Sequence, residues 1–399
     1  MQLGTVSISP APPPLPPFPP PSKVHVRVGA VPPRLFAYWS SPEIPEFAAA
    51  CFAAMRQTNP AWNFTILSSD NFDALGLAPP PQPPVGTVDT SHEQHMADWY
   101  RVEVIAKYGG VYMDATNVNF LPLENWVNVS SPAVQGFGRP ANTVQLGADG
   151  ALREEMENWA FAAPLGSAFV ARWRHHFAEA LSEGTDAWAA RQDPAVTGAL
   201  SGYLAEHIGW VLTRQELSRD AAPTTVLSST DVGRPFHFML EYDWVSCWVA
   251  FYTMQAPRSK FGQETAFLKF RGAERGCVSP LWMYSYFRFW PFADASEPSV
   301  AQWLSAQLDA EPDLKARSFT NTEVVHVGMF LLQWWIPLLL ITLGAVALCY
   351  AGLYCFGCAC CRRCTDRHAE RCRKGRCCTP HSEAETVGLT DKAAPLTGS

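Results

Sequence analysis

The pattern of hydrophobic and polar positions is clearest over residues 97–116, where it predicts a helix followed by a strand. Asp98 and Arg101 lie three residues apart and therefore share one face of the expected helix. Apolar residues recur at helical spacing between 102 and 106, which gives the helix a side that can be buried. The helix is thus expected to present a carboxylate and a guanidinium side by side.

Gly109 and Gly110 are expected to end this helix, because residues without Cβ can adopt the positive φ of a sharp exit. The apolar run 111–113 is rich in strand formers and too short for a helix, so it predicts a buried strand. This strand ends at Asp114. Open α/β sheets bind ligands at the carboxyl ends of their strands, which is where this aspartate would lie.

Residues 31–327 form an interval long enough for a single α/β domain with a substantial core. Further strands are expected at three places: 34–39, 63–67 and 323–326. Further helices are expected over three segments: 45–57, 167–181 and 199–213. The net charge of −7 argues against a nucleic-acid partner, which would favour a basic surface.

Both ends of the chain differ from this interval. Residues 1–30 are proline-rich and predict a disordered stem or linker, or a ligand for proline-binding modules. Residues 329–354 carry no charge and predict one transmembrane helix. The disordered tail, 355–399, mixes cysteines with basic residues. That mixture favours S-acylation at the cytosolic leaflet over a zinc site.

The basic tail predicts a single-pass protein with a lumenal domain in the Golgi or another endomembrane. Sequons at Asn63 and Asn128 are compatible with a lumenal domain, and its three cysteines, Cys51, Cys247 and Cys277, allow at most one disulfide. No apolar run near the start could serve as a signal peptide. A tail-anchored protein whose domain faces the cytosol is therefore the alternative.

The stretch A-D-W-Y-R-V-E-V-I-A-K-Y-G-G-V-Y-M-D-A-T resembles the DXD-type glycosyltransferases of the type-A fold. It is most similar to the capsular-polysaccharide-synthesis-like branch, related to glycosyltransferase family 32, whose strand ends Asp-Ala-Thr. The resemblance implies a Rossmann-like domain with a mixed, mostly parallel central sheet. It also implies transfer of a sugar from a nucleotide-diphosphate donor to a glycan or glycoconjugate.

The resemblance assigns Asp98 and Asp114 to the donor's ribose and sugar hydroxyls, and Arg101 to the sugar or a phosphate. A departing nucleoside diphosphate needs positive charge, usually Mn²⁺ or Mg²⁺ held by oxygen ligands. Asp114, Thr116 and His326 are the candidate metal ligands. Thr116 stands where many relatives have a second aspartate, and its neutral hydroxyl is a weaker ligand, so metal affinity could be low.

Three further residues are candidates for donor binding. Tyr38 and Trp39 end the first predicted strand and could stack on the base, although either could instead be a core aromatic. Asn158 could bond a sugar hydroxyl or act as a core-facing cap. The aromatic-rich region 236–292 could form an acceptor platform, but core packing or contact with a bilayer is favoured.

Two other classes of function stay open. A catalytically inactive sugar- or nucleotide-binding homologue is compatible with the threonine in place of the second aspartate. A membrane adaptor would instead use the proline-rich arm and the acylated tail, with the folded domain as a scaffold. If neither holds and the motif is accidental, Asp98 and Arg101 would be only a structural helix pair.

Overall fold

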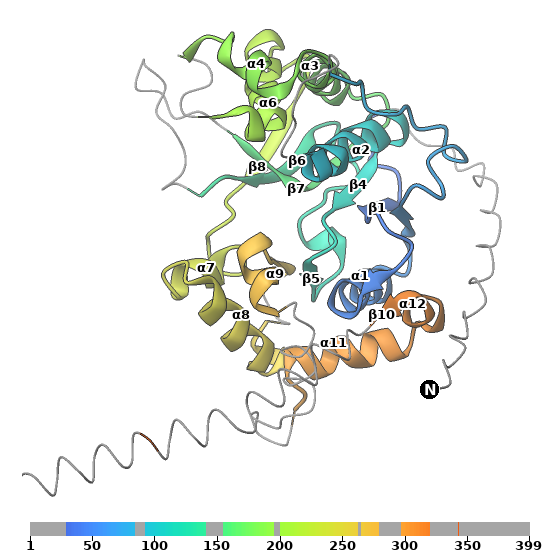
Figure 1. Ribbon diagram of the computed structural model, residues 1–399, viewed down its shortest axis with the longest axis vertical. Coiled ribbons are helices and arrows are strands. Elements are labelled where there is room, and N and C mark those ends of the chain that lie inside the picture. The colour runs from blue at the N-terminus through green and yellow to red at the C-terminus, as the bar shows by residue number, and fades with distance from the viewer. Residues whose placement is uncertain are drawn as a thin grey trace, which may run out of the picture. The chain divides into compact units, whose positions relative to one another are not determined.

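The computed structural model describes residues 29–83, 92–140, 155–194, 200–261, 265–278, 297–319 and 342 (Figure 1). The helices are α1 (Glu46–Thr58), α2 (His92–Tyr108), α3 (Ala168–Glu183), α4 (Thr185–Ala190), α6 (Ala205–Glu216), α7 (His237–Glu241), α8 (Ser246–Gln255), α9 (Gly272–Val278), α11 (Val300–Asp309) and α12 (Pro312–Arg317). Short 3-10 turns are η1 (Leu123–Asn125), η2 (Gly202–Leu204) and η3 (Arg258–Lys260). The strands are β1 (Arg34–Tyr38), β2 (Ile44–Pro45), β3 (Asn63–Leu67), β4 (Gly110–Met113), β5 (Asn117–Asn119), β6 (Val134–Gly138), β7 (Met156–Ala163), β8 (Thr224–Leu227), β9 (Phe267–Lys269) and β10 (Ser318–Phe319).

The central sheet has six strands in the order β3-β1-β4-β7-β6-β8. β1 pairs in parallel with β3 and β4, and β6 pairs in parallel with β8, while β7 runs antiparallel to both of its neighbours. The predicted mixed, mostly parallel α/β sheet is therefore confirmed. β5 leaves this sheet after the turn at Asp114 and pairs antiparallel with β9.

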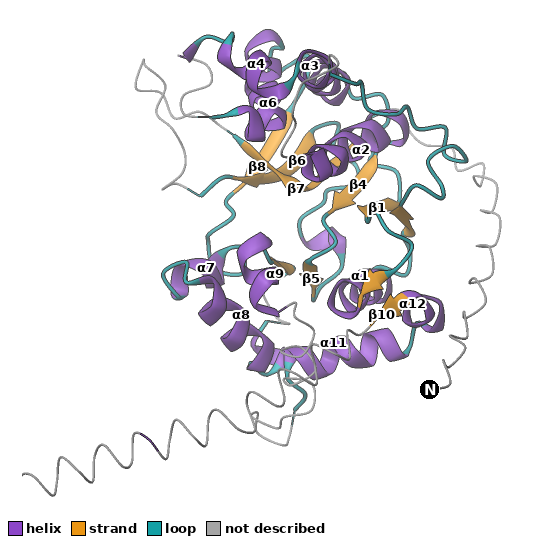
Figure 2. Ribbon diagram, in the orientation of Figure 1, coloured by secondary structure: helices purple, strands orange, loops and turns teal. Residues whose placement is uncertain are grey.

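The sheet lies between two groups of helices, with α2, α3 and α6 on one side and α1 and α11 on the other (Figures 1 and 2). Alternate strand residues supply the two hydrophobic cores, as the two-residue period of a strand requires. Leu35 and Val111 pack with α1, whereas Phe36 and Tyr112 pack with α2 and α3. Burial on both faces explains why these strands read as continuous apolar runs.

Most of the predicted elements form close to their expected bounds. The strand 63–67 is confirmed without change. The strand 34–39 ends one residue earlier than predicted, and the helix 45–57 begins and ends one residue later. The helix predicted over 199–213 forms later, as α6, after the turn η2. The expected strand 323–326 and the expected membrane span 329–354 lie outside the described residues, apart from Thr342. Among the helices that the structure does describe, none has the length and apolarity to cross a bilayer.

The Gly109–Gly110 corner turns the chain from α2 into β4 as predicted, with φ of +60° and +104°. A Cβ on Gly110 would lie 2.5 Å from the carbonyl oxygen of Arg34 on β1. Only glycine combines this conformation with so close an approach of two backbones. The corner therefore fixes the direction in which β4 delivers Asp114.

Gly110→Ala should destabilise the domain by roughly 2–4 kcal/mol, since it combines backbone strain with a steric clash. Denaturant unfolding of the full chain measures the loss. Gly276→Ala is the matched control, because it lies within α9 and its added Cβ would meet no described atom within 4 Å beyond its own stretch of helix. That control should leave stability unchanged or raise it, and equal losses in both variants would contradict this account of the corner.

Candidate active site

A cavity of about 610 Å³ opens at the carboxyl ends of β1 and β4. Tyr38 and Trp39 line it from the end of β1, and Asp114 lines it from the end of β4. The α2 residues Asp98 and Arg101 form another part of the wall. The sequence-predicted residues thus meet at the sheet edge where the strand pattern placed them.

The guanidinium of Arg101 is the centre of this site. Its Nη1 lies 2.7 Å from Asp98 Oδ1 and 2.9 Å from Glu206 Oε2, and its Nη2 lies 2.9 Å from Asp114 Oδ1. Arg101 is only 4% exposed. Burial by itself would lower the pKa of this guanidinium, but the three carboxylates together raise the pKa well above its ordinary value.

Glu206, on α6, is a part of the network that the sequence did not reveal. It is buried, and burial raises the pKa of its carboxyl well above the ordinary range although Arg101 opposes the shift. Asn158 Nδ2 donates to Glu206 Oε2 at 2.5 Å and to Asp98 Oδ1 at 3.3 Å. Both N–H bonds of this amide are therefore used, and only its carbonyl oxygen remains to bond a ligand.

Asp114 is held from two sides. Arg101 bonds Oδ1, and the ammonium of Lys269 on β9 bonds Oδ2. Burial opposes ionisation of Asp114, but Lys269 and then Arg101 outweigh it and lower the pKa of the carboxyl. Lys269 was not anticipated, since it lies 155 residues further along the chain.

Two of the three residues expected to hold Mn²⁺ or Mg²⁺, Asp114 and Thr116, are engaged by other groups of the protein in this structure. Thr116 is buried, and its hydroxyl donates to the carbonyl oxygen of Phe270 at 2.8 Å. Asp114 is already paired through both oxygens, and His326 lies outside the described residues. Within the described ranges, no three Asp, Glu, His or Cys side chains are grouped so as to hold a metal ion.

Tyr38 and Trp39 both line the pocket, but they make different contacts with the rest of the protein. The Tyr38 ring stacks against Tyr100 and Phe72, with ring centroids 5.9 and 6.3 Å away. Burial, with Glu93 and Tyr100, raises the pKa of Tyr38 to about 12. Trp39 donates its indole N–H to the carbonyl of Glu43 at 3.0 Å. Both rings are partly exposed at the cavity, as base stacking would require.

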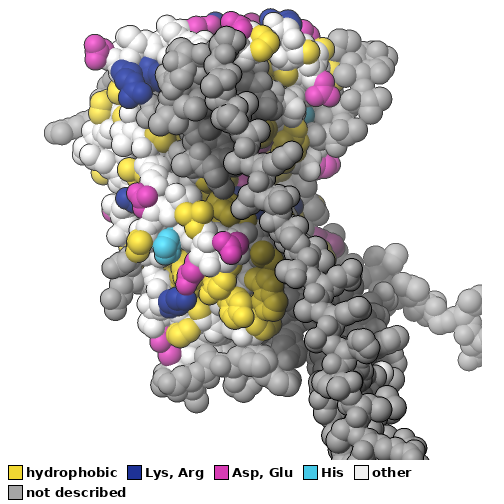
Figure 3. All heavy atoms as spheres, turned by 90° about the vertical axis from the view of Figure 1, so that its left-hand side faces the viewer, with side chains coloured by type: hydrophobic (Ala, Val, Ile, Leu, Met, Phe, Trp, Pro, Cys, Tyr) yellow, Lys and Arg dark blue, Asp and Glu magenta, His cyan; other side chains and the backbone are white. Residues whose placement is uncertain are grey.

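The aromatic residues of 236–252 do not line this pocket. Phe236 and Phe238 are buried in the core, which confirms the packing interpretation for them. Trp248 and Tyr252 are exposed on α8, and Figure 3 shows hydrophobic side chains gathered on that side of the molecule. The aromatics of 279–292 lie outside the described residues.

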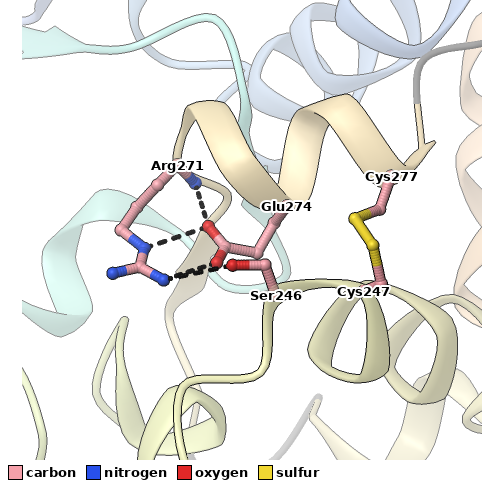
Figure 4. Close-up of a disulfide and its surroundings, with 5 residues drawn as sticks. All are labelled: Ser246, Cys247, Arg271, Glu274 and Cys277. Atoms are coloured by element: carbon pink, nitrogen blue, oxygen red, sulfur yellow. Dashed lines mark hydrogen bonds and ion pairs between the residues drawn. A yellow bond between two sulfur atoms is a disulfide. The ribbon is translucent and has the colours of Figure 1, made fainter.

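A disulfide joins Cys247 on α8 to Cys277 on α9, and Cys51 is free and buried. At the other end of α9, Arg271 bonds the carboxylate of Glu274 and approaches Ser246 Oγ at 3.5 Å (Figure 4). α9 is thus fastened to α8 at both ends. This arrangement holds the chain that follows β9 against the pocket.

No protein-family model and no curated protein matches this chain. Among solved structures, the chain is similar to one titled "PaToxG Glycosyltransferase", with 11% sequence identity, 48% of this chain and 72% of that chain covered, and a TM-score of 0.31. A likeness of this size is too weak to argue from, so the functional argument rests on the site itself. The particular family that the motif resembles stays a prediction.

Arg101→Met should cost about 3–5 kcal/mol of unfolding free energy, because it leaves buried carboxylates without their counter-charge. Denaturant unfolding at neutral pH measures this loss. Arg172→Met is the control, since the pair of Arg172 and Glu216 is 37% and 39% exposed and should be worth less than about 1 kcal/mol. Similar losses for the two variants would show that the Arg101 network does not stabilise the fold.

Proposed function

We propose that this protein is a glycosyltransferase that moves a sugar from a nucleotide-diphosphate donor to a glycan or glycoconjugate acceptor. The observation that carries the proposal is the convergence of Asp98, Arg101 and Asp114 on one cavity at the carboxyl edge of a mostly parallel sheet. Carboxylates there can accept hydrogen bonds from ribose and sugar hydroxyls. Partly exposed aromatic rings in the same cavity suit a nucleotide base.

The charges of the cavity also support a phosphate-bearing ligand. Arg139, Lys269, Arg271 and Arg275 line it together with Arg101. Charge that develops on a departing diphosphate is stabilised by cations held in place before the reaction. A donor in this pocket would thus meet hydrogen-bond acceptors for its sugar and cations for its phosphates.

Hydrolysis of a panel of nucleotide sugars by the full chain tests the proposal. Asp114→Asn keeps the shape of the side chain but removes its charge, so we expect turnover to fall at least about 100-fold. Asp313→Asn, an exposed change on α12 outside the pocket, should retain activity. Equal activity of the two variants would rule out the role given to Asp114, and thermal midpoints report whether both remain folded.

A catalytically inactive homologue is the second candidate, favoured by the engagement of both Asp114 oxygens in ion pairs. Binding of a nucleotide sugar without turnover, in the wild-type chain as in Asp114→Asn, would support it. The membrane adaptor depends on residues 1–28 and the tail, which lie outside the described part of the chain. Loss of binding to proline-binding modules on deletion of residues 10–21 would support that function.

We further propose that the chain is a single-pass endomembrane protein, of Golgi type, with this domain in the lumen. The Asn128 sequon lies exposed in a turn, whereas the Asn63 sequon enters β3 and its Thr65 is buried. Translation with microsomes should therefore yield one N-glycan that is lost in Asn128→Gln and kept in Asn63→Gln. An unglycosylated wild-type chain would favour the cytosol-facing, tail-anchored alternative.

A further inference from the structure

The cationic side chains that line the pocket differ in whether they have an acidic partner within the protein. Arg101 and Lys269 pair with Asp114, Arg139 pairs with Glu155 at 2.9 Å, and Arg271 pairs with Glu274 at 2.6 Å. The remaining cation, Arg275, is exposed, and the described part of the chain offers it no acidic partner. The guanidinium of Arg275 thus adds a positive charge to the cavity that no described carboxylate neutralises.

Lys269, at the end of β9, is fixed in place against the turn that carries Asp114. It is 7% exposed, and β9 pairs with β5 so that Lys269 lies opposite Asn117. The backbone N–H of Phe270 donates to the carbonyl of Thr116 at 3.2 Å, and the Thr116 hydroxyl donates back to Phe270. Thr116 is therefore used to fix the residue next to Lys269, and a carboxylate at position 116 could not make the same donation.

This arrangement puts an ammonium where a carboxylate-bound metal would be expected. A cation coordinated by Asp114 Oδ2 would have to share that oxygen with Lys269 or displace a buried ion pair. In return, Lys269 already brings to Asp114 the positive charge that a metal would have brought. A neutral threonine at position 116 and a cation at position 269 thus fit one charge balance around Asp114.

We propose that Lys269, Arg271 and Arg275 take the place of a divalent cation and bind the donor's diphosphate without metal. This inference rests on the proposed glycosyltransferase function. Guanidinium groups bind phosphate oxygens through paired N–H bonds, and a lysine ammonium acts as a point charge beside them.

The surrounding structure prepares two of these groups for an anion. Glu274, which is fully buried, bonds Arg271 through Nε and Nη2, and Figure 4 shows the other terminal nitrogen without a bond to the residues drawn. Burial lowers the pKa of Lys269, although Asp114 opposes the shift. A phosphate group beside Lys269 would be a second anion and would favour its charged form further.

Calorimetric titration of the full chain with UDP, GDP, ADP and dTDP, in EDTA and in Mn²⁺, tests the inference. At least one nucleotide should bind in EDTA within about threefold of its affinity in Mn²⁺. Arg275→Met should weaken that binding at least about tenfold, the value of a charge-assisted phosphate contact. This exposed change leaves the described ion pairs intact, so a loss of folding does not confuse the result.

Lys269→Met should weaken binding at least as much, with its thermal midpoint measured alongside because it removes a buried partner of Asp114. Lys315→Met, on exposed α12, is the matched control and should bind as the wild type does. Binding that requires Mn²⁺, or that Arg275→Met leaves unchanged, overturns the inference while the proposed function stands. Absence of binding by all four nucleotides in both conditions overturns the proposed function and this inference with it.

Discussion

A single buried guanidinium holds the candidate site together. Arg101 bonds carboxylates on its own helix, in the turn after β4 and on α6. Its removal would leave at least two of them with little compensation in a region of low dielectric. Such a centre is costly to bury and is therefore an unusual way to gain stability alone. Arg101 lies at the edge of a ligand-sized cavity, and a role in ligand binding would explain why the cost of burying it is tolerated.

The same interaction decides what the carboxylates can do. The charge of Asp114 is balanced within the protein by Arg101 and Lys269. The Asn158 amide donates its N–H groups to Asp98 and Glu206. The site is thus organised as a set of fixed acceptors beside fixed cations. Preorganisation of this kind suits a ligand that carries hydroxyl groups at one end and phosphates at the other.

The pocket is completed by segments that are far apart in the chain. The β5–β9 pair brings Lys269 to the turn after β4, and the Cys247–Cys277 disulfide fastens α9 to α8 (Figure 4). These ties bring the cationic side of the pocket against the acidic side. In the described part of the aromatic-rich region, Phe236 and Phe238 pack in the core, as the sequence favoured, and Trp248 and Tyr252 face solvent.

The sequence by itself determined the features that depend on near neighbours. The helix period placed Asp98 beside Arg101, the glycine pair set the corner, and the apolar run carried Asp114 to the sheet edge. Only the tertiary structure decided the partners of these residues. Glu206 and Lys269 arrive 105 and 155 residues away from the side chains that they bond, on a helix and a strand whose local patterns are those of ordinary core elements. Local periodicity records which face of an element is buried, but it carries no information about which distant element will lie against that face.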